Sequence, residues 1–430
     1  MLNSDRKNAP DFGKIEKLEI QQATLVKLDN GIPLYYIHAG SQDVIKLELI
    51  FNAGKIHQSK SLVASTTSSL IDDGTHKYSS SEIAEKIDFY GAYLGTKNNY
   101  DFADLTIHCQ TRHLKEILPL LLEMMTEATF PENELEIHKQ NSKAKIIQEL
   151  ERVEVMASNK FNEVIFGKSH PYGSSNNPED CDALTREDIL RFYQMNYRMK
   201  DSRIVLSGKV SDQVIREINS IFGITALVKS ENISQNDNAG KEFFSTPEKK
   251  HFLKKEKAVQ SAIRIGKTFI NKTHPDYGSV RVLNTLLGGY FGSRLMSNIR
   301  EDKGYTYGIH SGISSYQKNA SILISTEVGA EVTDDAVKEI FLEIKKLREI
   351  LVDEQELQLV KNYLMGSFMR SIDGPFGLAD IFINLNNYNL DYEYYEQYFQ
   401  TVKSVTPKRI RDLAVQYFSE DSFYTVVAGQ

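Results

Sequence analysis

Arg300 and Tyr307 are the two side chains whose types and spacing best suit chemistry at a carbonyl group. The local pattern predicts a short helix capped by Ser293, a turn at Gly304, and then a strand over residues 305–316. This layout places the guanidinium and the phenol on either side of one tight turn. A planar fork of donors beside a hydroxyl, both held by rigid elements, forms a donor pair suited to a developing oxyanion.

A purely structural interpretation of the same two residues competes with this one. An arginine on a short helix is usually solvated or ion-paired, and a tyrosine on a strand is usually half-buried packing. The local residues leave both interpretations open, so the surrounding elements must decide between them.

Other reactive groups in the chain lack the spacing that their chemistry requires. His108 and His113 flank the end of a predicted strand, whereas Glu134 and His138 form an i, i+4 pair on a predicted helix. Neither pair has a third ligand at a fixed spacing, so neither predicts a metal site. The chain also shows no Gly-x-Ser-x-Gly turn and no glycine-rich phosphate-binding loop.

Composition limits the class of protein. The 430 residues are 41% hydrophobic and 25% charged, which is typical of a globular chain with apolar material for two or more cores. A net charge of −7 and a pI of about 5.9 argue against general nucleic-acid binding. Cys109 and Cys181 form no C-x-x-C pair and predict buried thiols of a reducing compartment. Because neither a signal peptide nor a membrane-spanning run is visible, we expect a cytoplasmic protein.

Strand and helix patterns follow one another regularly in the first half. The expected elements are a hairpin over 25–40 around Asn30-Gly31, a strand over 44–55, a helix over 60–74, a helix over 78–91 opened by a Ser79-x-x-Glu82 capping box, a strand over 102–111, helices over 113–130 and 131–156, and a strand at the end of 191–210. A polar stretch without periodicity then predicts a linker over 229–248.

The same order of elements returns in the second half. The corresponding stretches are 48–55 with 261–269, 91–110 with 304–326, and 121–146 with 340–368. This repeat predicts an internal duplication of one α+β unit, in which each copy is a mostly antiparallel sheet with helices packed on one face. The predicted domains are 1–228 and 249–430, and two such domains enclose a cavity between them.

Two longer stretches resemble a known family. They are LLGGYFGSRLMSNIREDKGYTYGI at 286–309 and GKSHPYGSSNNPEDCDALTREDILRFYQMNYR at 167–198. Together with the order of elements over nearly the whole chain, they resemble the pitrilysin or insulinase family of zinc peptidases. More narrowly, the chain is similar to bacterial half-length subunits related to mitochondrial processing peptidase. The resemblance implies one half of a clamshell, in which Arg300 and Tyr307 reach a substrate carbonyl held at zinc.

The resemblance also implies where zinc-binding residues should lie. In that family a His-x-x-Glu-His run supplies two ligands and the general base. Aligned on the following Gly74-Thr75, the two histidines fall on Ser65 and Ser69, and the glutamate falls on Ser68. A serine hydroxyl is a poor zinc ligand, and Ser68 cannot act as a carboxylate base.

The remaining ligand position falls on Glu149, with Glu151 and Glu154 as alternatives on the same predicted helix. One carboxylate without its histidines does not form a zinc site, and the charged face of an exposed helix is the favoured interpretation of Glu149. We therefore expect no metal and no other cofactor in this chain.

Retention of the donor pair without the zinc ligands predicts a composite enzyme. We expect a heterodimer in which a sister subunit supplies zinc through His-x-x-Glu-His, and this chain supplies Arg300 and Tyr307 to an unfolded peptide. The resemblance implies such pairing, because half-length members of the family work as dimers and mixed active and inactive pairs occur. Alone, the chain is expected to be inactive and to form, at most, a homodimer. The alternatives are a peptide-binding or scaffold protein of the same fold and, last, a self-sufficient peptidase with a replacement metal site.

Overall fold

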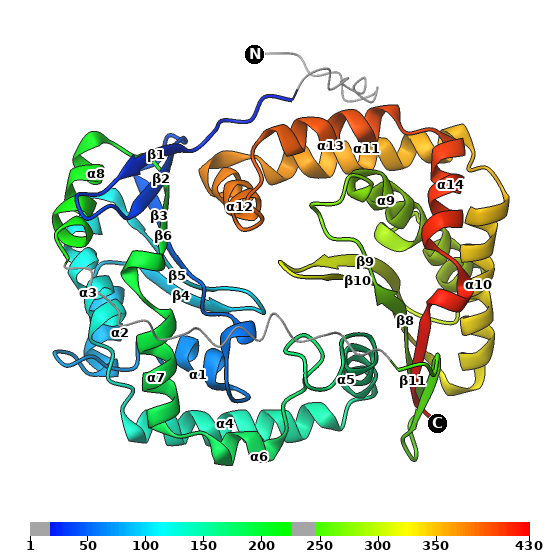
Figure 1. The fold of residues 1–430 in the computed structure, drawn as a ribbon, viewed down its shortest axis with the longest axis horizontal. Coiled ribbons are helices and arrows are strands. Elements are labelled where there is room, and N and C mark those ends of the chain that lie inside the picture. The colour runs from blue at the N-terminus through cyan, green and yellow to red at the C-terminus, as the bar shows by residue number, and fades with distance from the viewer. Residues whose placement is uncertain (1–17, 226–245) are drawn as a thin grey trace, which may run out of the picture.

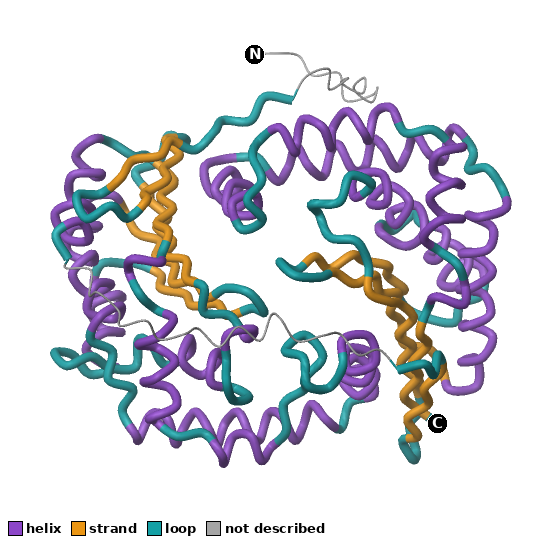
Figure 2. The backbone as a smooth tube through the Cα atoms, in the orientation of Figure 1, coloured by secondary structure: helices purple, strands orange, loops and turns teal. Residues whose placement is uncertain are grey.

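Two similar α+β halves lie side by side in the computed structural model, which describes residues 18–225 and 246–430 (Figure 1). Each half contains one sheet, and most helices of that half cover the side of the sheet that faces away from the other half (Figure 2). The predicted linker over 229–248 lies almost entirely outside the described residues. The domain limits at 228 and 249 therefore stay predictions.

The first sheet has six strands in the order β1-β2-β6-β3-β5-β4. β2 and β6 run parallel, and the other neighbours are antiparallel. The strands are β1 Thr24–Lys27, β2 Pro33–His38, β3 Val44–Phe51, β4 Tyr93–Asn98, β5 Ala103–Gln110 and β6 Arg203–Gly208. The helices are α1 Val63–Ser69, α2 Ser80–Phe89, α3 Leu114–Thr126, α4 Glu132–Leu150, α5 Val153–Phe166, α6 Pro178–Ala183, α7 Arg186–Asn196 and α8 Asp212–Ile218.

The second sheet has five strands in the order β7-β11-β8-β10-β9. β7 and β11 run parallel, and the other neighbours are antiparallel. The strands are β7 Lys250–Lys254, β8 Gln260–Thr268, β9 Ile309–Ser315, β10 Ala320–Gly329 and β11 Tyr424–Gly429. The helices are α9 Tyr277–Asn284, α10 Thr333–Glu349, α11 Glu354–Ser371, α12 Gly374–Asn386, α13 Glu393–Ser404 and α14 Pro407–Tyr417, and a π-helical segment covers Met296–Asp302.

The two sheets share one plan, which confirms the predicted fold class and its duplication. Without β1, the order β2-β6-β3-β5-β4 matches β7-β11-β8-β10-β9 strand for strand, and the first pair is parallel in both. A parallel pair at the same place in two mostly antiparallel sheets requires the same long connection in both halves.

One helix from each half packs on the sheet of the other half. On α5, Phe161 and Ile165 share a buried cluster with Val426 of the second sheet. On α12, Leu378 and Phe382 share a cluster with residues of the first sheet, and the rings of Phe382 and Tyr35 lie 4.6 Å apart. Each sheet is therefore covered on its second face by a helix from the other half of the chain.

Local sequence signals located most elements of the first half correctly. Gly31 has a left-handed φ of 88° between β1 and β2, and Ser79 and Glu82 form the predicted capping box at the start of α2. The single helix predicted over 131–156 is wrong, because an extended Arg152 separates α4 from α5. Without this break α5 could not turn onto the second sheet.

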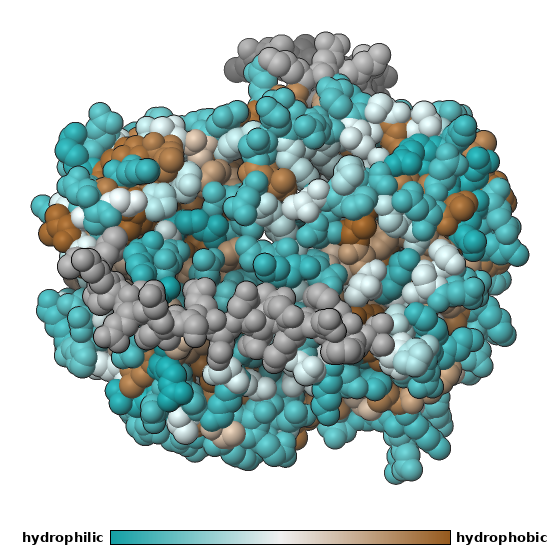
Figure 3. Space-filling view, in the orientation of Figure 1, coloured by the Kyte–Doolittle hydropathy of each residue, from teal (hydrophilic) through white to brown (hydrophobic). Residues whose placement is uncertain are grey.

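The face of the molecule in Figure 3 is mainly hydrophilic, and its hydrophobic residues form small separate groups. Over 18–225 and 246–430, no helix is both long enough and apolar enough to cross a membrane.

Candidate functional site

The segment that carries Arg300 is fixed to its own half of the protein. Arg300 lies in the π-helical segment Met296–Asp302, and Arg294 just before it forms a bidentate ion pair with Glu356 on α11, at 2.7 and 2.8 Å. Such fork-to-fork pairs restrict orientation as well as position. The predicted turn follows at Gly304, which has a left-handed φ of 67°.

Ser293 stands at the predicted N-cap position, directly before the first helical residue, but its side chain does not cap the helix. Its carbonyl accepts a hydrogen bond from the Ser297 amide at 2.9 Å, but its buried hydroxyl has no hydrogen-bond partner among the described residues. The side chain is only 1% exposed, so the N-terminal amides of this helix lack the hydroxyl cap that the sequence predicted.

Tyr307 lies in a loop and not in the predicted strand, because β9 begins only at Ile309. The hydroxyl of Thr306 donates to the Glu327 carbonyl at 2.7 Å and accepts from the Gly308 amide at 3.1 Å. These side-chain hydrogen bonds take the place of the main-chain bonds that would otherwise extend the pairing of β9 with β10. They hold a loop from which Tyr307 projects with 95% of its surface exposed.

The structure brings Arg300 and Tyr307 to one open pocket of about 810 Å³. The Arg300 guanidinium lies over the ring of Phe291, 4.7 Å from its centroid, and pairs with none of the described carboxylates. Stacking on an aromatic face leaves the edge of a guanidinium free to donate hydrogen bonds. Sequence reasoning missed Phe291 and Thr306. The available signals were an aromatic residue shortly before Arg300 and a hydroxyl directly before Tyr307.

The three serines at the expected zinc-motif positions lie on α1 but in different surroundings. Ser65 donates to the Leu62 carbonyl at 3.0 Å, Ser68 is buried and Ser69 is exposed. Hydroxyls that differ in this way do not form a convergent ligand set, and neutral oxygens are weak ligands for zinc.

The carboxylates considered for the distal ligand position are all engaged by basic side chains. Glu149 lies 3.9 Å from the Lys145 ammonium, Glu151 pairs with Lys255 of the other half at 2.6 Å, and Glu154 pairs with Arg152. Across the described parts of the chain, no three His, Cys, Asp or Glu residues gather closely enough to hold a metal ion. The residues present therefore do not fit zinc.

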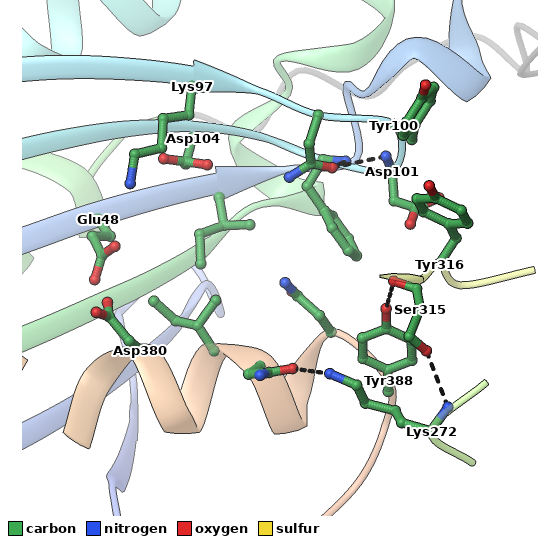
Figure 4. Close-up of a pocket in the computed structure, with 16 residues that line it drawn as sticks. Glu48, Lys97, Tyr100, Asp101, Asp104, Lys272, Ser315, Tyr316, Asp380 and Tyr388 are labelled. Carbon is green, nitrogen blue, oxygen red and sulfur yellow. Dashed lines mark hydrogen bonds between the residues drawn. The ribbon is translucent and has the colours of Figure 1, made fainter. Parts of the chain in front are cut away.

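A second pocket of about 430 Å³ lies between the halves, where the sequence predicted a cavity without naming the residues that line it (Figure 4). One end carries Glu48 and Asp104 from the first sheet and Asp380 from α12. Burial raises the pKa of both Glu48 and Asp104. Sequence reasoning predicted a strand over 44–55 but could not foresee that α12 covers one face of its sheet.

The opposite end of this pocket contains aromatic and basic side chains. Tyr100, Tyr316 and Tyr388 line it together with Lys272, whose ammonium lies 4.3 Å from the centroid of the Tyr388 ring (Figure 4). The pocket therefore carries charges of both signs at each end, because Lys97 lines it beside Asp104 and Asp101 lines it beside Tyr100 (Figure 4).

Two regions of the chain match known protein families. Residues 35–169 match the family described as Insulinase (Peptidase family M16), and residues 183–364 match the Peptidase M16 inactive domain. The two matches together span most of the chain and both halves of the fold. The chain therefore belongs to the M16 peptidase family, as the sequence motifs indicated.

Individual relatives agree with this assignment. An uncharacterized zinc protease YmxG of Bacillus subtilis is 26% identical over 357 residues, which cover 81% of this chain and 83% of the relative. A non-peptidase homolog YmxG of Helicobacter pylori is 22% identical and covers 81% of this chain and 79% of the relative. The crystal structure of a peptidase M16 inactive domain from Pseudomonas fluorescens has a TM-score of 0.83 at 21% identity, covering 95% of this chain and 98% of that chain. The fold is shared although the sequences have diverged.

Proposed function

We propose that this chain is the zinc-less subunit of a heterodimeric zinc metallopeptidase and supplies Arg300 and Tyr307 to the bound peptide. One observation carries the proposal: two hydrogen-bond donors without a carboxylate partner in the described chain line one open pocket. An exposed tyrosine contributes little to its own fold. Its position is better explained by a group that arrives from outside.

In the proposed reaction the sister subunit would hold zinc through His-x-x-Glu-His, and the metal would supply the activated water. When the peptide carbonyl is attacked, its oxygen gains negative charge. The Arg300 guanidinium and the Tyr307 hydroxyl then donate hydrogen bonds to this oxygen. Donors positioned in advance, Arg300 by the π-helical segment and Tyr307 by the loop after it, stabilise the transition state without a further cost of reorganisation.

The first sheet offers a place for an extended peptide. β4 is the last strand of its sheet, and it packs against α1, the helix that carries the three serines. An unpaired sheet edge can accept a peptide as an added strand through main-chain hydrogen bonds. The exposed Tyr93 on β4 would lie beside such a strand.

The alternative is a catalytically inactive protein of the same fold that binds peptides or acts as a scaffold. The names of its relatives support inactivity of this chain alone, since one is a non-peptidase homolog and another an inactive M16 domain. We keep a cytoplasmic location within the proposal, because Cys109 and Cys181 are both free and buried.

Reconstitution with a sister subunit tests the proposal. Unstructured peptides are incubated with this chain, with a His-x-x-Glu-His sister subunit, and with the mixture. We expect cleavage in the mixture that far exceeds either protein alone and that a zinc chelator abolishes. Binding of the sister subunit and peptide without cleavage would instead support the inactive peptide-binding alternative.

A further inference from the structure

A third pocket, in the second half, carries an excess of positive charge. It has a volume of about 530 Å³ and is bordered by α9, α11, α12 and α13. Arg281 and Arg370 line it directly. Lys272 lies at its border, because its ammonium donates to Asn384, which lines both this pocket and the pocket between the halves.

These three cations lack acidic partners within the described chain. Asp380, the one carboxylate among the described residues that line the pocket, is held by Lys46 of the first half at 2.7 Å. The Arg281 guanidinium instead lies over the ring of Tyr398, 5.1 Å from its centroid. An aromatic face attracts a cation but does not neutralise its charge.

The positive charges also act on one another. Burial, and then the like charge of Arg281, lower the pKa of Lys272 to about 8. A lysine with a lowered pKa shows that its charged form is poorly compensated in this position. An anion bound between Lys272 and Arg281 would supply the missing compensation.

Neutral donors and apolar side chains complete the pocket. The hydroxyls of Ser367, Ser371 and Tyr395 line it, and burial raises the pKa of Tyr395 to about 12, so that its phenol stays a donor at neutral pH. Leu364 and Phe368 lie beside them. A guanidinium can bind a carboxylate with two parallel hydrogen bonds, and the apolar side chains suit a group attached to it.

We propose that this pocket binds the α-carboxylate of a peptide. The two pockets have Asp380 and Asn384 in common among their lining residues. The α-carboxylate of such a peptide meets the positive charge of Arg281 and Arg370, and the side chain of its last residue meets Leu364 and Phe368. Free phosphate satisfies the cations but leaves the apolar side of the pocket unfilled. Only the choice of a peptide as the ligand rests on the proposed function.

Calorimetric titration of the full chain without any sister subunit tests this site. The probes are the acetylated peptide Ala-Ala-Ser-Ala-Leu with a free C-terminal carboxylate, the same peptide with a C-terminal amide, and inorganic phosphate. We expect the free carboxylate to bind at least about tenfold more tightly than the amide, as is typical of a charge-assisted hydrogen bond. Arg370→Gln and Arg281→Gln should remove this preference, whereas Arg191→Gln, which changes an exposed arginine on α7, should leave it intact.

Arg370 is exposed on α11, so its variant keeps the test meaningful if Arg281→Gln fails to fold. Equal affinity for the acid and the amide, or the absence of binding by all three probes, would overturn the proposal. Phosphate that binds as tightly as the peptide acid would also overturn it and assign the pocket to a free anion. A mixture inactive in the peptidase assay would leave a measured carboxylate preference unaffected, so the two proposals can fail separately.

Discussion

Lys46 on β3 and Asp380 on α12 form an ion pair of 2.7 Å that joins the two halves of the chain. The Lys46 ammonium also lies 3.0 Å from the carboxylate of Glu48 on the same strand, and these two side chains are only 10% and 8% exposed. One buried cation therefore compensates a carboxylate from each half. The contact between the halves depends on this charge balance as well as on apolar packing.

Replacing this cation should destabilise the fold strongly. Lys46→Met leaves Glu48 buried without its partner, and we expect the free energy of unfolding to fall by about 3 kcal/mol or more. Urea denaturation measures the change. The matched control is Lys209→Met, which breaks an exposed pair with Asp43 and should cost less than about 1 kcal/mol. Equal losses in the two variants would contradict the role assigned to Lys46.

The stability of the fold should depend on the carboxyl group of Asp72, which follows α1. Burial, and then the charge of Asp73, raise the pKa of Asp72 to about 6 from an ordinary value of 3.8. Between these values the folded chain keeps a proton that the unfolded chain has released. The contribution of Asp72 to stability therefore falls as pH rises from about 4 to about 6.

Asp72→Asn should remove this decline. Its gain in the free energy of unfolding over the native chain should grow from pH 4 to pH 6, level off near pH 7, and reach at most about 3 kcal/mol. Urea titrations at pH 4, 5, 6 and 7 measure the gain. A difference that does not change over this range would show that the carboxyl titrates normally in the folded state.

The donor pair should matter only in the reconstituted enzyme. We expect Arg300→Ala and Tyr307→Phe each to lower kcat/KM of the mixture by about a hundredfold or more, because each removes a donor to the developing oxyanion. Thermal unfolding should barely change, since Tyr307 is almost fully exposed. Arg191→Ala serves as the control for loss of a surface arginine. A peptidase rate unaffected by both site variants would remove the assigned role.

Restoring the carboxylate of the zinc motif should be costly. Ser68 is only 4% exposed, so Ser68→Glu should lower the free energy of unfolding by about 2–4 kcal/mol through an unpaired buried carboxylate. Ser69→Glu, one residue later on the exposed side of α1, should change it by less than about 0.5 kcal/mol. Similar denaturation midpoints for the two variants would mean that α1 is oriented differently.

The sequence predicted what local patterns and an internal repeat can reveal. The capping box at Ser79 and the hairpin at Gly31 follow from short-range rules, and the structure confirms both. The duplicated order of elements follows from the internal repeat, and the two sheets confirm it. The motif around Arg300 also placed this residue and Tyr307 close together, and both line one pocket.

The features that were missed depend on contacts distant in sequence. Periodicity shows that residues 153–166 and 374–386 have apolar faces, but it cannot show that each helix covers the sheet of the other half. The same limitation hid which residues line the pocket beside Glu48, because β3 alone does not show that α12 covers it. Tyr307 was assigned to a strand because alternation does not register a competing hydrogen bond from the Thr306 hydroxyl.

The reciprocal placement of α5 and α12 means that neither half is a free-standing module. If the halves were separated, each sheet would lose the helix that covers one of its faces. The apolar faces of α5 and α12 would also be exposed, and such apolar surfaces favour aggregation. If the chain were cut between the halves, we expect the two fragments to stay bound to each other. The repeat in the sequence therefore records two copies of a unit that now exist only as an interlocked pair.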